Sequence, residues 1–397
     1  MTGSHDGQAP PLRIAMIGTR GVPARYGGFE TAVEEVGSRL AERGHHVRVY
    51  CRNGNSEAGD AFAGMELVHL PALRHRALET LSHTGVSVAH LLTRRTDVAF
   101  VFNAANAPFL PLLRAARVPV ATHVDGLEWK RTKWSASGKR YYRWAEGVAV
   151  RQSDALIADA RGIADYYRAE FGADTRLIAY GAPIVAAGTD RLAELGLEAG
   201  RFHVAVARFE PENHVHLVVE GYVASSATQP LVVVGSAPYT DEYTRRVHAV
   251  AGGDPRVRFL GGVWDQELLD QLYANATTYL HGHSVGGTNP SLLRAIGAGT
   301  ATIAYDVAFN REVLGGNGWY FPDAPAVARA IELAEAAPQE VARRGAALLD
   351  RARDYSWDDV ASGYEMLAAD LRAGRVHGRQ RARRSRASEL AFRAAWR

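Results

Sequence analysis

Short apolar runs alternate with amphipathic stretches along most of the chain. The first run, Arg13–Ile17, is followed by a stretch in which Phe29, Val33 and Leu40 recur at helical spacing, and then by an apolar run at 47–50. This spacing predicts a helix with one apolar face between two buried strands. A strand, a glycine-containing loop, a helix and a second strand form a βαβ unit, which indicates a parallel sheet.

The alternation is interrupted at Gly181-Ala182-Pro183 and then starts again, which predicts two α/β units of similar size. The expected strands are 99–102, 118–122, 156–158 and 177–180 before this break, and 202–207, 231–235, 257–261, 277–280 and 301–305 after it. The expected helices include 160–171, 214–222, one with its apolar face at 268–273, 291–298, and a last one from Trp357 to Leu367.

A chain of 397 residues exceeds what one ordinary core can organise, so we expect two domains. Both should be Rossmann-like α/β domains, at 13–183 and 184–373, with the last helix packing back on the first domain. Residues 1–12 are expected to be a disordered leader. Residues 374–397 form a basic tail.

The composition is that of a soluble globular protein, with 47% hydrophobic and 22% charged residues. Cys51 is the one cysteine, so no intrachain disulfide can form, which suits a reducing compartment. Residues 1–10 hold no apolar segment of the kind found in signal peptides. No apolar run reaches the length of a membrane span. We therefore expect a cytoplasmic protein.

The formal net charge of +3 is unevenly distributed. Residues 374–397 contain eight Arg and one Glu, so the tail carries +7 and the rest of the chain −4. The folded body therefore gives no reason to expect nucleic acid as a partner. With Leu390, Phe392 and Trp396, the tail is typical of a basic anchor on an anionic membrane surface. A solvated, disordered tail is the alternative, and both interpretations remain open.

The stretch His281–Arg294 has the strongest pattern for ligand binding. The apolar run 277–280 leads into two histidines, a turn at 286–290, and a helix start with Pro290 or Ser291 at the cap. Backbone N–H groups and the helix dipole at such a turn can bind an anion, and glycines let the backbone approach a ligand closely. An ordinary loop that merely needs glycines is the alternative.

A second glycine pair, Gly27-Gly28, stands where the first expected helix begins. Its spacing is not GxGxxG, so it is no dinucleotide fingerprint. Backbone amides at this helix start could meet a phosphate or a sugar. A purely structural turn is the alternative.

His123 and Asp125 directly follow the expected strand 118–122. Ligands of open α/β sheets bind at the carboxyl ends of strands, which makes this pair a candidate for chemistry; a structural histidine is the alternative. Interleaved aromatic and basic residues at 128–134 suit a polyanion, a sugar or a membrane surface. They equally suit a solvated helix end with inward-packed tryptophans.

These loops could act together if the two halves face one another across a cleft. Gly27, Gly28 and His123 would then oppose Arg208 and the turn at 283–290. Cationic and N–H groups would meet a diphosphate there, with the His–Asp pair near the reacting sugar.

At Arg208 and His281–Arg294 the sequence resembles a retaining glycosyltransferase of family 4, with the two-domain GT-B fold. The resemblance covers nearly all of 13–370. Four motifs resemble more narrowly a bacterial subgroup that includes rhamnosyltransferases of capsule and cell-wall polysaccharide assembly. They are IGTRGVPARYGGFET (17–31), HVDGLEWKRTKW (123–134), RFEPEN (208–213) and HGHSVGGTNPSL (281–292).

The resemblance implies a role for each candidate residue. Arg208 would bind the donor diphosphate and stabilise the charge that develops on it. His123 would contact the donor sugar near the reacting carbon, and Val263 and Trp264 would lie near the base. The residues assigned to catalysis are His123, Arg208 and Asp125, and those assigned to donor binding are Gly27, Gly28, Val263, Trp264, His283, Gly286, Gly287, Thr288, Asn289 and Arg294.

The sequence departs from the family pattern at three positions. Asn213 stands where the family usually has a lysine, and Gly286 and Arg294 stand where it has two glutamates. Arginine cannot accept the ribose hydrogen bonds of the second glutamate; it could instead reach a phosphate.

The implied reaction is a metal-independent, retaining hexosyl transfer. The donor would be a nucleotide-diphosphate sugar such as dTDP-rhamnose, used as substrate with no cofactor. The acceptor would be a glycan or a lipid-linked glycan in cell-surface polysaccharide assembly. No Asp-x-Asp motif stands at an expected strand exit. The alternatives are a catalytically silent nucleotide-sugar-binding subunit and a GT-B sugar-nucleotide epimerase. We expect the first domain to serve the acceptor and the second the nucleotide sugar.

Overall fold

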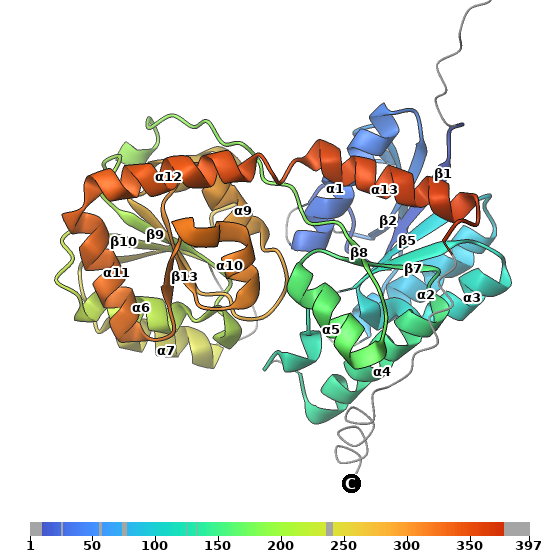
Figure 1. The fold of residues 1–397 in the computed structure, drawn as a ribbon, viewed down its shortest axis with the longest axis horizontal. Coiled ribbons are helices and arrows are strands. Elements are labelled where there is room, and N and C mark those ends of the chain that lie inside the picture. Colours follow the sequence, from blue (N-terminus) through green and yellow to red (C-terminus); the bar gives the residue numbers. More distant parts are fainter. Residues whose placement is uncertain are drawn as a thin grey trace, which may run out of the picture. The chain divides into compact units, whose positions relative to one another are not determined.

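The computed structural model describes residues 10–24, 27–54, 58–73, 78–124, 126–132, 134–235 and 241–376 (Figure 1). These residues divide into two compact units. The first unit contains the described chain up to Trp129, then 134–179, and the chain from Trp357 onward; the second contains 130–132 and Tyr180–Ser356.

The first unit is built on an eight-stranded sheet with the order β3-β4-β2-β1-β5-β6-β7-β8. Only the β3–β4 pair is antiparallel among the described strand pairs of this sheet. The central strand β5 is buried along its whole length, as a sheet covered on both faces requires. The strands are β1 Arg13–Ile17, β2 His46–Arg52, β3 Ala61–Phe62, β4 Met65–Leu70, β5 Val98–Phe102, β6 Val120–His123, β7 Ala155–Ala158 and β8 Arg176–Leu177.

Helices cover both faces of this sheet, with α1 and α13 packed together on one face and α2, α3 and α4 on the other (Figure 1). The carboxylate of Glu365 on α13 accepts hydrogen bonds from Arg43 (2.7 Å) and His45 (3.0 Å), which fixes the last helix in the first unit. The helices are α1 Gly28–Glu42, α2 Glu79–Leu92, α3 Leu110–Ala115, α4 Ala136–Gln152, α5 Arg161–Phe171 and α13 Trp357–Arg372, with short 3₁₀ turns η1 Ala104–Phe109 and η2 Glu128–Lys130.

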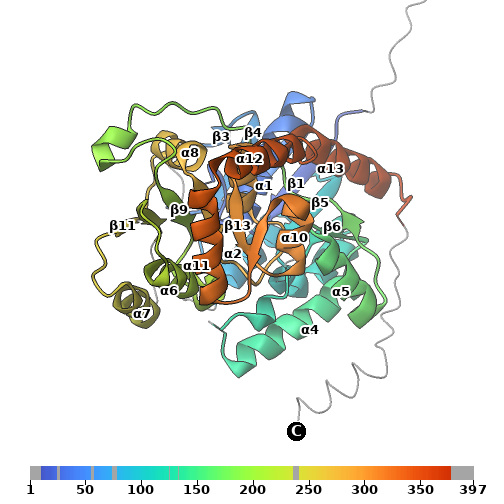
Figure 2. The same cartoon turned by 60° about the vertical axis from the view of Figure 1, so that its left-hand side comes forward.

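The second unit has a six-stranded, parallel sheet with the order β11-β10-β9-β12-β13-β14. Helices α6, α7 and α11 lie together in both ribbon views, and their apolar residues form one core with this sheet (Figure 2). The strands are β9 His203–Val206, β10 Leu231–Val234, β11 Val257–Gly261, β12 Thr278–His281, β13 Thr302–Tyr305 and β14 Trp319–Phe321. The helices are α6 Val215–Ala224, α7 Asp241–Ala251, α8 Gln266–Asn275, α9 Pro290–Gly297, α10 Ala308–Leu314, α11 Ala324–Ala336 and α12 Pro338–Ala352, with 3₁₀ turns η3 Leu192–Leu195, η4 Pro211–Asn213 and η5 Gly315–Asn317.

The structure confirms the expected fold class, two Rossmann-like α/β domains with parallel sheets. It differs in detail from the apolar pattern. The strand expected at 118–122 begins at Val120, because Pro119 has no N–H to donate to a neighbouring strand. The strand expected at 177–180 is shortened to β8, and the last helix continues to Arg372. The two-residue strand β3 is too short for periodicity to predict it.

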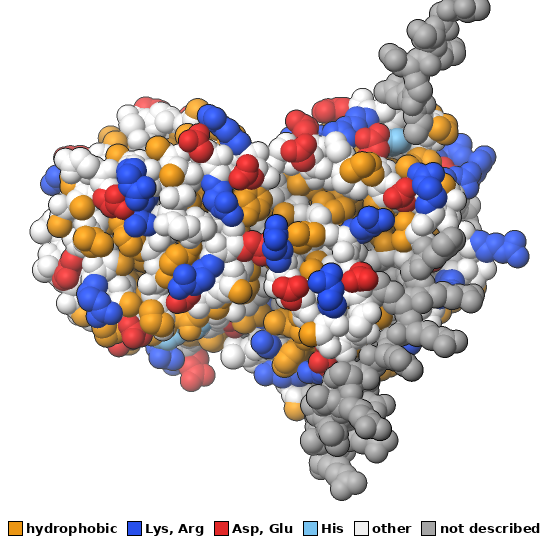
Figure 3. Space-filling model, viewed as in Figure 1, with side chains coloured by type: hydrophobic (Ala, Val, Ile, Leu, Met, Phe, Trp, Pro, Cys, Tyr) orange, Lys and Arg blue, Asp and Glu red, His pale blue; other side chains and the backbone are white. Residues whose placement is uncertain are grey.

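The surface of the described residues carries charges of both signs. On the face shown in Figure 3, Lys and Arg side chains are interspersed with Asp and Glu. None of the helices in the described ranges is both long and apolar enough to cross a membrane.

Candidate functional site

Arg208 and the glycine turn follow two neighbouring strands of the second unit. Strand β9 ends at Val206, strand β12 ends at His281, and the two strands pair in parallel. The carboxyl ends of parallel strands meet at one edge of a sheet, so both loops start from the same edge. The structure therefore brings Arg208 and the start of the 281–294 stretch together, as the sequence predicts.

Two polar contacts, one between main-chain groups and one from a side chain, hold these two loops against each other. The amide of Ser284 donates to the carbonyl oxygen of Glu212 (2.9 Å), and the ring of His214 lies 2.9 Å from the carbonyl oxygen of Gly282. A Cβ at Gly282 would stand 2.1 Å from the carbonyl oxygen of Asn213. Only glycine fits this approach without a shift of the backbone.

Arg208 is anchored through its main chain and leaves its guanidinium partly exposed. The side-chain amide of Asn213 donates to the Arg208 carbonyl oxygen at 2.9 Å. The Arg208 side chain is 37% exposed, and its Nη1 lies 3.3 Å from Glu210 Oε1. A guanidinium held this way can exchange a nearby carboxylate for an anionic ligand.

Two stacked histidines stand at the end of strand β12, since His281 is its last residue and His283 follows it. The rings of His281 and His283 lie 4.4 Å apart and nearly parallel, and Tyr279 Oη is 2.9 Å from His281 Nδ1. Burial lowers the pKa of His281 to about 3. Burial also lowers the pKa of His283 well below its ordinary value, and the positive charges of Arg208 and Arg131 lower it further. Both rings are therefore neutral near pH 7 and can serve as hydrogen-bonding groups rather than charges.

The turn after His283 leads directly into helix α9. Gly286 has φ +132°, a backbone conformation that favours glycine. Its surroundings are open, since a Cβ built there would meet no neighbouring atom within 4 Å. Thr288 is buried. The helix cap is Asn289, not the expected Pro290 or Ser291, because its side-chain oxygen accepts from the amide of Ser291 (3.0 Å).

The other predicted donor residues of the second unit lie on separate elements. Val263 and Trp264 follow the edge strand β11, and the Trp264 side chain is 73% exposed. The guanidinium of Arg294 on α9 forms an ion pair with Asp270 on α8. Arg294 is therefore engaged by a carboxylate within its own unit.

The glycine pair of the first unit stands at the start of helix α1. Gly27 has φ +105° and occupies the cap position, and Gly28 is the first residue of the helix. The carboxylate of Glu30 folds back toward this turn, and its Oε1 accepts from the amide of Arg20 (3.1 Å). Burial raises the pKa of Glu30. Sequence reasoning missed Glu30, although its position in the first helical turn was a signal for such a bond.

His123 is the last residue of strand β6 and is 1% exposed. Its Nδ1 lies 2.7 Å from the hydroxyl oxygen of Tyr364, and its ring contacts Phe29 and Phe102. Burial lowers the pKa of His123 to about 3, so the ring is neutral near pH 7. Asp125, the predicted partner of His123, lies outside the described residues.

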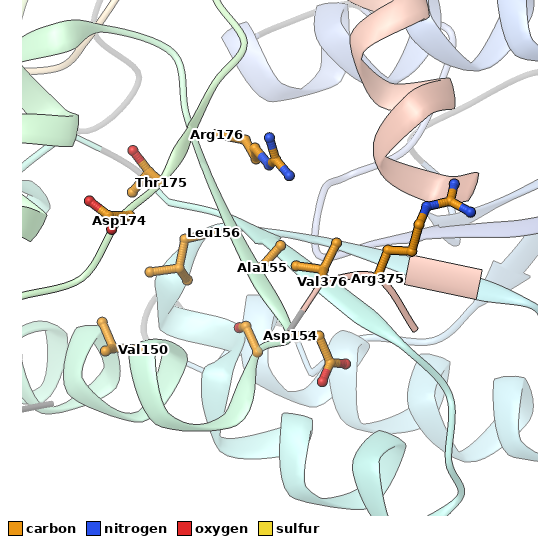
Figure 4. A pocket seen from close by; sticks show the side chains of 10 residues that line it. Val150, Asp154, Ala155, Leu156, Asp174, Thr175, Arg176, Arg375 and Val376 are labelled. Atoms are coloured by element: carbon orange, nitrogen blue, oxygen red, sulfur yellow. The ribbon is translucent and has the colours of Figure 1, made fainter. Parts of the chain in front are cut away.

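The first unit has a cavity of about 320 Å³, with Ala155, Arg176 and Val376 among the residues that line it (Figure 4). It opens at the amino end of strand β7, beside Ser153, Asp154 and Ala155. Because β6 and β7 run parallel, this end of the sheet is opposite to the one that carries His123. Within the described ranges, no group of three or more His, Cys, Asp or Glu could hold a metal ion.

Each of the two units matches a known protein family. Residues 27–181 match the family described as "Glycosyl transferase 4-like domain", and residues 200–334 match "Glycosyl transferases group 1". The chain therefore contains one domain of each of these two glycosyltransferase families, and its two parallel-sheet units have the GT-B fold.

Solved structures share this fold at low sequence identity. Sucrose-phosphate synthase from Thermosynechococcus elongatus aligns with a TM-score of 0.79 and 22% identity, over 91% of this chain and 99% of that one. HepE from Anabaena, solved in complex with UDP-glucose, aligns with a TM-score of 0.74 and 16% identity, over 90% of this chain and 100% of that one.

A curated relative matches over a shorter stretch. It is the GtfA subunit of UDP-N-acetylglucosamine–peptide N-acetylglucosaminyltransferase from Streptococcus gordonii, 27% identical over 125 residues. The match covers 30% of this chain and 24% of that relative, so this chain spans about a quarter of the relative's length.

Proposed function

We propose that this protein transfers a hexose, with rhamnose as one candidate, from a nucleotide-diphosphate donor to a glycan or lipid-linked acceptor. The observation that carries the proposal is the placement of Arg208 and the 282–289 turn at the carboxyl ends of the adjacent strands β9 and β12. A guanidinium and a turn that opens a helix suit the diphosphate of such a donor. The complex of HepE with UDP-glucose supports a nucleotide-sugar donor by analogy of fold.

The site must stabilise the negative charge that develops on the leaving diphosphate. The bond between the anomeric carbon and the phosphate oxygen breaks, the acceptor oxygen bonds to that carbon, and the acceptor proton leaves with the diphosphate or to water. Arg208 stabilises the developing charge, a type of contribution that is commonly the largest single one in catalysis. We propose that the acceptor attacks on the face from which the diphosphate leaves, so that the configuration is retained. We also propose that Arg208 and backbone amides stabilise the leaving diphosphate without a metal ion.

The remaining assignments are part of the same proposal. Gly286–Asn289 would contact the donor through backbone N–H groups, and Trp264, being exposed, would be available to a nucleotide base. His123 would act on the donor sugar as a neutral ring. For Gly27 and Gly28 we propose contact with the donor diphosphate.

The test is a turnover assay with a panel of labelled nucleotide sugars and glycan or lipid-linked acceptors. Transfer predicts a labelled acceptor together with a free nucleoside diphosphate, and Arg208→Ala should abolish both. An epimerase would give an altered sugar without any acceptor, and a silent binding subunit would bind a nucleotide sugar without product. Full activity in Arg208→Ala would refute the role of this residue.

Association with the cytoplasmic face of a membrane is a separate part of the proposal. It rests on the basic tail, of which the residues after Val376 lie outside the described structure. A chain that ends at Val376 keeps Arg375, which pairs with Asp370 on α13 (2.8 Å), so the folded unit stays intact. Full-length protein should co-sediment with anionic vesicles and the shortened chain should not; equal sedimentation would remove the anchor.

A further inference from the structure

Residues 130–132 form a short segment that groups with the second unit, although the chain before and after it belongs to the first. Two carboxylates near Arg208 hold this segment. Arg131 Nη1 lies 3.4 Å from Glu210 and 3.6 Å from Glu212, and the hydroxyl of Thr132 donates to Glu212 at 3.0 Å.

Glu210 stands between two arginines. Its Oε1 lies 3.3 Å from Arg208 Nη1, and its Oε2 lies 3.4 Å from Arg131 Nη1. Strong charge-assisted hydrogen bonds between guanidinium and carboxylate groups are shorter, at about 2.7–2.9 Å. The carboxylate therefore bridges the two guanidinium groups loosely, and a better anion can displace it from either one.

Both arginines also act on one residue of the candidate site. The charges of Arg208 and Arg131 contribute to the lowered pKa of His283, which lies just before the glycine turn. The Arg131 side chain is only 13% exposed and that of Arg208 is 37% exposed. Partial exclusion of water strengthens the attraction of this pair for an anion beyond its value at an open surface.

A diphosphate carries more negative charge than one arginine can neutralise. Asn213 cannot add a charge, since it is neutral and its amide is bonded to the Arg208 carbonyl oxygen. Arg294 is held by Asp270 in a closer ion pair than either of those that Arg131 forms with Glu210 and Glu212. Arg131 offers a second positive charge, brought to Arg208 by a carboxylate that both share.

We infer that Arg131 is a second anion-binding residue of the donor site, and that a diphosphate replaces Glu210 between Arg131 and Arg208. This inference rests on the proposed function, because it needs a nucleotide-diphosphate donor. In the absence of donor, Glu210 is the internal anion that keeps the two guanidinium groups close together. When donor binds, one phosphate takes over from each carboxylate oxygen.

The experiment measures binding of UDP, dTDP, GDP and ADP, and of the matching monophosphates, by titration calorimetry. The variants are Arg131→Gln, Arg208→Gln and Arg140→Gln. Arg140 is exposed on helix α4, so its substitution controls for the loss of one positive charge alone. Arg131→Gln should weaken diphosphate binding about tenfold or more. It should weaken monophosphate binding less, a change of ratio that general loosening of the fold would not produce.

A second variant keeps the inference testable if Arg131→Gln fails to fold. Glu210→Gln removes the competing carboxylate charge and should tighten diphosphate binding several-fold, and inorganic pyrophosphate should compete more effectively against it. If Arg131→Gln folds and binds like wild type while Arg208→Gln loses binding, Arg131 is a structural ion-pair residue and the inference fails, but the proposed function stands. Unchanged or weaker binding by Glu210→Gln also contradicts the inference. If wild type binds none of the four diphosphates, the proposed function fails first.

Discussion

The side-chain amide of Asn213 donates a hydrogen bond to the carbonyl oxygen of Arg208 at 2.9 Å, and Asn213 is 1% exposed. Asn213 is therefore a buried residue that holds the main chain of the Arg208 loop in place. We predict that Asn213→Ala destabilises the protein by about 1–3 kcal/mol, because a part-buried carbonyl oxygen loses its partner. Urea denaturation of the variant and wild type measures this difference.

Asn213→Lys sharpens the same prediction. A lysine at this position would have to bury an ammonium group, at a larger desolvation cost than a methyl group, so the variant should be less stable than Asn213→Ala. A Lys variant with wild-type stability and higher transfer activity would show that the position is open to a ligand, contrary to this account.

The bond between His123 and Tyr364 predicts a selective loss of turnover. Tyr364→Phe removes the hydroxyl oxygen that lies 2.7 Å from His123 Nδ1 and leaves the ring free to change its orientation or tautomer. The expected result is a lower kcat with little change in donor KM, measured in the transfer assay.

Tyr50→Phe is the matched control for that experiment. Tyr50 is also buried in the first unit, and its hydroxyl oxygen lies 3.1 Å from Nδ1 of His90. Its loss should cost similar stability and leave kcat unchanged. If Tyr364→Phe and Tyr50→Phe had the same kcat, the bond between Tyr364 and His123 would have no role in catalysis, contrary to this prediction.

Buried histidines predict sensitivity to acid. Burial lowers the pKa of His83 to about 4 and that of His123 to about 3. Below pH 6.5 these histidines are protonated in the unfolded chain but stay neutral in the folded protein. The free energy of unfolding therefore falls as the pH falls toward 4. Between pH 6.5 and 5 each ring should cost about 2 kcal/mol. Urea denaturation at pH 7.5 and 5.0 measures this loss.

His83→Asn should reduce that pH dependence, whereas His46→Asn, at an exposed histidine, should not. The comparison uses the difference between the two pH values within each variant, so a general loss of stability does not affect it. The same pH dependence in His83→Asn and wild type would refute the assignment.

The close approach at Gly282 can be tested against a glycine in open space. A Cβ at Gly282 would stand 2.1 Å from the Asn213 carbonyl oxygen, whereas a Cβ at Gly162 on helix α5 would meet nothing within 4 Å. Gly282→Ala should lower the free energy of unfolding by about 2 kcal/mol or more. Gly162→Ala should raise it by about 0.5–1 kcal/mol. Similar effects of the two changes on thermal unfolding would contradict the contact.

The two parallel sheets could be predicted because apolar runs and helical spacing are local signals. The placement of Arg208 beside the 281–294 stretch could also be predicted, since it depends only on strand ends meeting at one edge. The contact of His123 with Tyr364 joins residues 241 positions apart, and no local pattern encodes it. The grouping of Arg131 with Glu210 likewise depends on tertiary packing.

Helix ends and individual ion pairs are harder to predict from the sequence, because they depend on tertiary contacts. Asn289 and Ser291 are both good cap residues by type, and only the geometry of the turn decides that Asn289 is the cap. The ion pair between Arg294 and Asp270 on the neighbouring helix α8 is likewise not evident from the sequence. Such choices depend on partners that a linear pattern does not bring together.

The most direct measurement is the kcat of Arg208→Gln at saturating donor, with the nucleotide sugar that the turnover assay selects and Arg140→Gln as control. The account predicts a fall of about 100-fold or more, since the charge on the leaving diphosphate develops mainly in the transition state. A variant that keeps the wild-type kcat would show that Arg208 does not take up that charge and would contradict the account.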